Sequence, residues 1–128
     1  MTDLTPYFNR LDILNDTAKQ IIKDFGMAGL EIKFSGTADN AYAELFAQIL
    51  PHIEKMLTHK NSPLLRREAG AEAFYNLMYR IDISETQIKK AVEQATDKSF
   101  SEVVTDLILK RELLKVITRK NYSAGKEL

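Results

Sequence analysis

His52 and His59, the two histidines of the chain, are its residues best suited to metal or acid–base chemistry. They are seven positions apart, so a continuous helix would bring them near one face. Glu44 precedes His52 by eight positions and would lie on the same side. Metal-binding helical bundles use such faces, but with a closer Glu-x-x-His spacing and with further ligands from other helices. The spacing therefore predicts no metal site. A small-ligand or metal-binding bundle around these three residues is the weakest of three functional interpretations.

The chain also lacks the residues that other kinds of catalytic site require. The chain has no cysteine, which excludes disulfides, thiolate metal sites and cysteine nucleophiles. Two histidines in one helix give no Ser-His-Asp order, and no G-x-S-x-G sequence occurs. The five glycines form no phosphate-binding run. We therefore expect a protein that is not an enzyme and uses no cofactor.

Composition and charge narrow the class of protein further. A chain of 128 residues with 45% apolar and 28% charged residues is typical of one globular domain. Its formal net charge of zero counts against a strongly basic nucleic-acid binder. No apolar run approaches the roughly 20 residues of a membrane span, and the N-terminus does not resemble a secretory signal. We expect a cytoplasmic location and no membrane partner.

The apolar residues recur mostly at three- and four-residue steps, which predicts an all-α fold. We expect residues 1–128 to form a single compact domain of about five helices. The expected helix starts are Thr5-Pro6, Thr37 or Asp39, Asn61-Ser62-Pro63, Ser84, and Ser99 or Ser101. Pro51 removes one backbone hydrogen bond and is expected to kink or break the second helix near Leu50. Residues 121–128 form a polar tail that is expected to fray.

One short stretch departs from the helical pattern. Leu30, Ile32 and Phe34 alternate with Glu31 and Lys33, a pattern typical of a short strand. The chain shows no second convincing strand. Residues 30–34 are therefore interpreted as a short strand, as an extended loop, or as a strand that pairs with a copy of itself in a dimer.

The most specific pattern in the chain lies in residues 72–118. A helix that ends near Ile81 is followed by a short turn and by the capping box Ser84-Glu85-Thr86-Gln87. This order is that of a helix–turn–helix, in which residues 84–95 would be the recognition helix that enters the DNA major groove. Glutamine can pair with adenine, and lysine with guanine or phosphate. Thr86, Gln87, Lys89 and Lys90 are therefore candidate DNA-binding residues.

The same segment resembles one half of the DNA-binding domain of AraC-type transcription regulators. The residues that carry the resemblance are Leu77, Ile81, Ile83, Ser84, Ile88, Lys90, Thr96, Lys98, Ser99, Phe100, Ser101, Glu102, Leu107, Leu109 and Arg111. The resemblance implies that Thr86, Gln87, Lys89 and Lys90 face the bases, and that Lys98 and Ser99 lie near phosphates. That family carries two such units and one is visible here. Because a single unit binds DNA weakly, we expect a homodimer.

The leading hypothesis is a non-catalytic regulatory or interaction module, best specified as a small helix–turn–helix protein that binds double-stranded DNA in transcription regulation. The competing hypothesis is a helical protein–protein interaction or scaffold domain with no nucleic-acid affinity. It would use the exposed faces of the first helix or the last helix, which is basic from Lys110 onward. The surface position of residues 84–95 separates the two, because burial of their polar face would exclude DNA reading.

Overall fold

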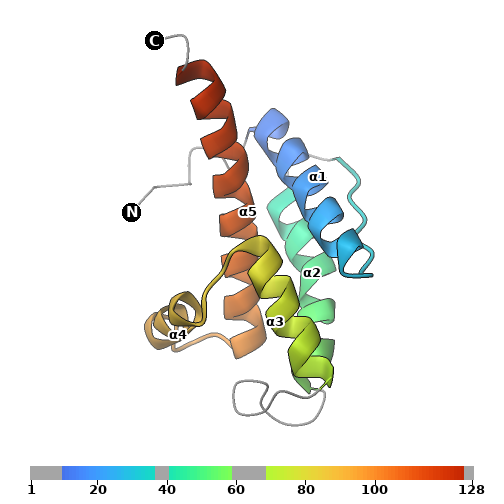
Figure 1. Cartoon of the computed structure of the whole chain (residues 1–128), viewed down its shortest axis with the longest axis vertical. Coiled ribbons are helices and arrows are strands. Elements are labelled where there is room, and N and C mark those ends of the chain that lie inside the picture. The colour runs from blue at the N-terminus through green and yellow to red at the C-terminus, as the bar shows by residue number, and fades with distance from the viewer. Residues whose placement is uncertain (1–9, 37–40, 59–68, 126–128) are drawn as a thin grey trace.

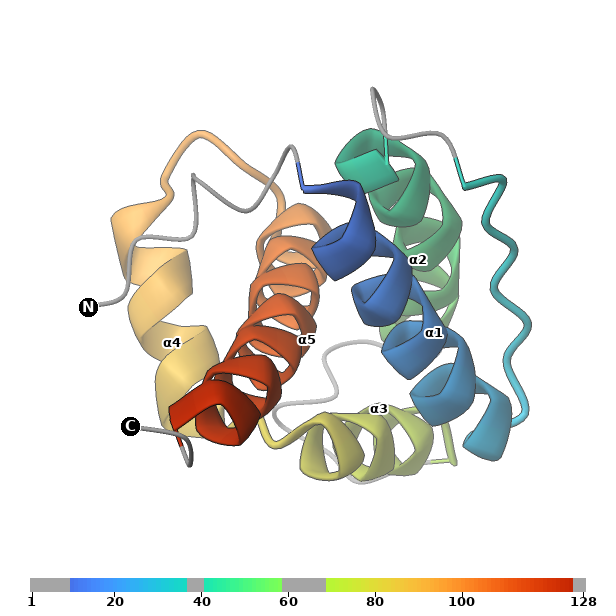
Figure 2. The ribbon, with the colours of Figure 1, turned by 90° about the horizontal axis from the view of Figure 1, so that it is seen from above.

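The structure, a computed structural model, describes residues 10–36, 41–58 and 69–125. This part of the chain forms five helices and contains no strand (Figure 1), which confirms the predicted all-α fold. The helices are α1 (Leu11–Met27), α2 (Ala41–Thr58), α3 (Ala69–Ile81), α4 (Glu85–Gln94) and α5 (Phe100–Gly125). Helix α5 lies at the centre of the domain and contacts each of the other four (Figure 2). None of the helices in the described ranges has the length and apolarity that crossing a bilayer requires.

The hydrophobic core lies where α1, α2, α3 and α5 meet. Its largest fully buried side chains are Leu14, Ile21, Phe25, Leu45, Ile49, Ile53, Phe74, Leu77, Ile81, Ile88, Ile108 and Leu109. Eleven of these twelve come from α1, α2, α3 and α5, and α4 contributes only Ile88. A fully buried Leu, Ile or Phe side chain stabilises the fold by about 1.5–3 kcal/mol. The core therefore holds these four helices together much more strongly than it holds α4.

Three of the expected helix starts lie outside the described residues: Thr5-Pro6, Thr37 or Asp39, and Asn61-Ser62-Pro63. Arg10, the first residue that the structure describes, is extended, and α1 starts at Leu11. The predicted break at Pro51 is wrong, because α2 continues through this residue. Pro51 and Ala47 are both exposed, so water can reach the Ala47 carbonyl group that the proline leaves without its helical partner. Ile49 and Ile53, buried on either side, keep the helix packed.

The two C-terminal helices begin with the motifs that the sequence indicates. Ser84 Oγ accepts the Gln87 N–H, and Gln87 Oε1 accepts the Ser84 N–H, which completes the predicted capping box. Ser99, rather than Ser101, caps α5 through the same pair of bonds with Glu102. Helix α5 continues to Gly125, so the expected tail of residues 121–128 is helical over most of its length.

Residues 30–36, which we call the strap, connect α1 toward α2 without forming a strand. The side chain of Ile32 is buried and those of Leu30 and Phe34 are half-buried, whereas Glu31 and Lys33 are exposed. The alternating pattern therefore reflects an extended segment that packs one face on the core. The strap runs along the edge of the molecule beside α1 and α2 (Figure 2).

Candidate nucleic-acid interface

The turn between α3 and α4 is held by a specific set of hydrogen bonds. The Ile83 N–H donates to the Met78 carbonyl group and the Asp82 N–H donates to that of Tyr79, which is the Schellman arrangement. Asp82 has a φ of 73°, a left-handed conformation that Gly, Asn and Asp adopt most readily. Arg111 of α5 donates to Asp82 Oδ2 over 2.6 Å. The turn therefore has a defined geometry, and its ion pair links it to the central helix.

Helix α4 rests on the domain through a narrow apolar stripe. Ile88 is 1% exposed, and Ala91 and Val92 are half-buried. All the polar residues of α4 are exposed, among them the predicted base-contacting residues Thr86, Gln87, Lys89 and Lys90. The polar face of residues 84–95 thus points to solvent, and the burial that would have excluded DNA reading does not occur.

The structure does not bring all six candidate residues to one place. Thr86, Gln87, Lys89 and Lys90 lie on α4 itself, whereas Lys98 and Ser99 lie beyond its C-terminal end, where α5 begins. Two of the six also have roles within the chain. Gln87 Oε1 is used by the capping box, and Ser99 Oγ accepts the Glu102 N–H. The candidates whose side chains form no hydrogen bond or ion pair within the described residues are the exposed lysines and Thr86.

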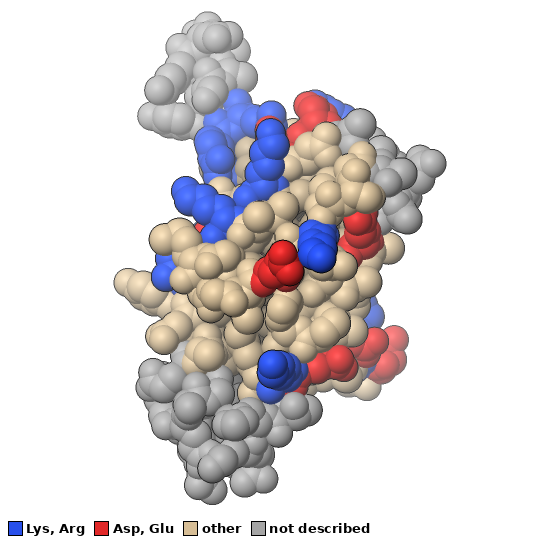
Figure 3. Space-filling view, turned by 90° about the vertical axis from the view of Figure 1, so that its right-hand side faces the viewer, with Lys and Arg blue, Asp and Glu red and all other residues tan. Residues whose placement is uncertain are grey.

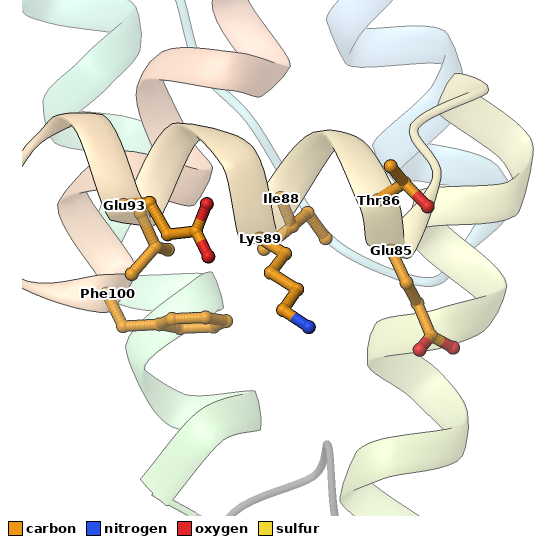
Figure 4. Close-up of a pocket in the computed structure, with 7 residues that line it drawn as sticks. Glu85, Thr86, Ile88, Lys89, Glu93 and Phe100 are labelled. Atoms are coloured by element: carbon orange, nitrogen blue, oxygen red, sulfur yellow. The ribbon is translucent and has the colours of Figure 1, made fainter.

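An apolar groove of about 550 Å³ runs beside α4. Its apolar lining comes from Ile88, Val92 and Phe100. Glu85, Lys89 and Glu93 also line the groove, as the close-up in Figure 4 shows. These three residues alternate in charge along the helix, so α4 presents acidic and basic groups together rather than a uniformly basic surface.

The last helix does not offer the free basic face that its sequence suggests. Lys110 pairs with Asp106 over 2.7 Å, and Lys120 pairs with Asp16 of α1 over 2.7 Å. Arg119 Nη2 donates to Gln20 Oε1 over 2.7 Å. Basic side chains do gather toward the end of the molecule where α5 finishes (Figure 3). Lys120 and Arg119 are nevertheless tied to α1, so this face serves mainly to join α5 to α1.

A buried polar cluster lies between the same two helices. Lys115 Nζ lies 3.1 Å from Glu112 Oε1 and 3.6 Å from Asp24 Oδ2. Gln20 donates to Asp24 from one turn earlier in α1. Glu112 is 0% exposed, and neither of its carboxylate oxygens has a hydrogen-bond partner among the described residues. Burial, and then the neighbouring Asp24, raise the pKa of Glu112 to about 8.

The polar stripe of α2 that contains His52 and Glu44 binds the strap. Glu44 accepts the backbone N–H and the hydroxyl of Ser35, each over 2.7 Å, and Gln48 accepts the Lys33 N–H over 3.2 Å. His52 Nε2 lies 2.9 Å from the Glu31 carbonyl oxygen. That oxygen can only accept, so Nε2 carries the proton. The described residues contain no group of three or more His, Asp or Glu side chains that could hold a metal ion. His59 lies outside them.

Sequence reasoning missed two residues near the candidate interface. Tyr79, whose helical spacing indicates a core position, is 88% exposed at the end of α3. Asp82 carries the left-handed turn conformation and binds Arg111. An Asp two residues before a capping Ser is a signal that could have indicated the turn. The exposure of Tyr79 depends on where α3 lies in the fold, and its spacing could not have shown it.

Comparisons with known proteins give no relative of this chain. No protein-family model matches its sequence, no curated protein is similar to it, and no solved structure matches its fold. The functional assignment therefore rests on the residues and geometry described above.

Proposed function

We propose that this chain is a non-catalytic interaction module and that α4 is a recognition helix for double-stranded DNA. The observation that carries the proposal is the position of α4, which buries only Ile88 and leaves its polar face in solvent. The α3–turn–α4 geometry, with its left-handed Asp82 and capped helix, supports the same assignment. Thr86, Lys89 and Lys90 would contact base edges or phosphates from the first two turns of the helix.

The test is a titration of a labelled duplex of mixed sequence, followed by fluorescence anisotropy at several salt concentrations. DNA binding through Lys89 and Lys90 predicts an affinity that falls steeply as salt rises, because bound counterions are released. The variant Lys89→Glu/Lys90→Glu should lose at least about tenfold in affinity and show a shallower salt dependence. Circular dichroism should show unchanged helicity, because both side chains are exposed.

The matched control is Lys19→Glu/Lys23→Glu, which makes the same charge change at two exposed positions of α1. A general loss of electrostatic attraction would weaken both variants equally. A loss confined to the α4 variant would assign binding to α4. If wild-type protein shows no salt-dependent affinity for the duplex, or if both variants bind as wild type does, DNA recognition by α4 is wrong.

A second candidate function follows from the groove beside α4. Its apolar lining of Ile88, Val92 and Phe100, and the mixed charges of Glu85, Lys89 and Glu93, favour an amphipathic segment of a protein partner. The variant Val92→Lys separates the two candidates, because a lysine can extend from this half-buried position into the groove. It should weaken a docked protein segment while leaving DNA affinity equal or higher.

A further inference from the structure

The strap has two backbone edges, and α2 occupies one of them. In an extended chain, the N–H and C=O groups of alternate residues point to opposite edges. The groups of Glu31, Lys33 and Ser35 are bound by His52, Gln48 and Glu44. The opposite edge carries the backbone groups of Ile32 and Phe34, which lie between these residues. Within the described ranges, the backbone N–H groups of Ile32 and Phe34 have no hydrogen-bond partner.

An extended segment with one free edge is a template for another strand. We propose that the strap is a self-association surface, at which the strap of a second copy of this chain pairs antiparallel through the edge formed by Ile32 and Phe34. This proposal is independent of DNA binding, because α4 lies on the opposite side of α5 from the strap (Figure 2).

The charges of the strap select a second copy as the partner and fix the register. Pairing about a two-fold axis at Ile32 places Glu31 opposite Lys33 of the other copy, and Lys33 opposite Glu31. Both side chains are exposed, and neither has an ion-pair partner among the described residues. Shifting the register by two residues would instead place Glu31 opposite Glu31, or Lys33 opposite Lys33. Opposite charges directly across an antiparallel pair are favourable and like charges are unfavourable.

The hydrogen-bonding groups agree with this register. Ile32 would exchange both of its backbone bonds with Ile32 of the second copy. The Phe34 N–H would donate to the Leu30 carbonyl group across the pair. The Leu30 N–H is already bound to the Phe25 carbonyl group, so the pairing is short. The side of the molecule that carries the strap is mostly uncharged, with acidic and basic groups scattered over it (Figure 3). Net repulsion between two such sides is therefore small.

The position of the strap makes the pairing feasible. It lies along the margin of the domain rather than between helices (Figure 2). Gly29, which precedes the strap, and Gly36, its last residue, have left-handed φ values of 79° and 90°. A short two-stranded contact is expected to give a weak dimer that forms as the protein concentration rises.

Charge exchange tests the pairing and its register together. Sedimentation velocity of the wild-type chain should show dimer formation that increases with concentration. Lys33→Glu places Glu opposite Glu at two positions, and Glu31→Lys places Lys opposite Lys, so each variant should dimerise about tenfold more weakly. An equimolar mixture of the two variants pairs Lys with Glu at both positions and should dimerise as wild type does. Lys19→Glu, an exposed reversal on α1, should have no effect.

Amide hydrogen exchange locates the contact. Raising the concentration from the monomeric to the dimeric range should slow exchange at Ile32 and Phe34, while Lys33 and Ser35 should change little because α2 already binds them. The proposal is overturned if the wild-type chain stays monomeric, or if the single reversals dimerise as well as wild type does. It is also overturned if mixing the two variants restores no dimer.

Discussion

Helices α2 and α4 are both amphipathic, yet they use their polar side chains in different ways. On α2, Glu44, Gln48 and His52 bind the backbone of the strap, so these polar groups are part of the fold. On α4, Thr86, Lys89 and Lys90 form no hydrogen bond or ion pair within the described residues. A polar stripe on a helix therefore indicates a binding function only where the chain's own groups do not already bind it. By this criterion, the histidine-containing stripe of α2 is structural and the stripe of α4 is available to a partner.

The largest expected effect on stability comes from Glu112, a carboxyl group of α5 that is buried in the helical domain to which α2 also belongs. Its pKa of about 8 lies above its ordinary value near 4.3, so the folded state retains a proton that the unfolded state has lost. The contribution of this group to stability is therefore full below about pH 4.3 and is lost as pH rises to about 8. Glu112→Gln stays neutral and should be more stable than wild type by several kcal/mol above pH 8, since linkage allows up to about 1.4 kcal/mol per pH unit.

Urea denaturation of both proteins from pH 4 to pH 9 measures this difference. Asp24 and Lys115 face Glu112 and are present in both proteins, so the difference between the two curves reports the ionisation of Glu112 together with its interactions with these two groups. The two stability curves should converge at acid pH and separate as pH rises. Parallel curves would mean that the Glu112 carboxylate ionises in its buried site at no cost to stability.

The next effect compares one buried isoleucine from each helix. Ile49→Ala in α2 should lower the free energy of global unfolding by about 2–5 kcal/mol, because this side chain is 0% exposed in the centre of the core. Ile88→Ala removes the same atoms from α4 but should act locally. We expect it to speed hydrogen exchange of α4 amides while those of α2 remain protected. Equal acceleration in both helices would show that α4 unfolds only with the whole domain.

The helices themselves could be predicted well from sequence, because their signals are local. Apolar periodicity indicated every described helix, the Ser84 capping box placed the start of α4, and the choice of Ser99 or Ser101 placed the start of α5 to within two residues. The predicted break at Pro51 was wrong because the cost of a proline depends on whether the carbonyl group that it leaves unpaired is hydrated, which requires knowing the exposed face of α2. The strap took the extended-loop form, one of the alternatives that its sequence left open. Its period of two is real, but side chains of α2, rather than a neighbouring strand, bind one of its two backbone edges.

The environment of the charged residues could be predicted least. Glu112 appears in the sequence as one acid within a basic, apparently solvated helix end. It is buried because α5 is surrounded by the other four helices. This burial depends on how the helices pack, which no local sequence pattern indicates. The exposure of the candidate residues on α4 follows from its own pattern, since Ile88, Ala91 and Val92 form a single narrow stripe. The exposure of the polar face of α4 could therefore be predicted from its sequence, while the roles of His52 and Glu44 required the fold.

The smallest effect tests the contrast between the two polar stripes directly. Glu44→Ala removes the acceptor of two bonds from Ser35 and should cost about 1–2 kcal/mol of global stability. Lys90→Ala removes an exposed side chain of α4 that forms no bond within the described residues, and should change stability by less than about 0.5 kcal/mol. Thermal and urea denaturation of both variants measure the difference. If Lys90→Ala proves as costly as Glu44→Ala, the polar face of α4 also serves the fold, and its exposure would no longer indicate a binding surface.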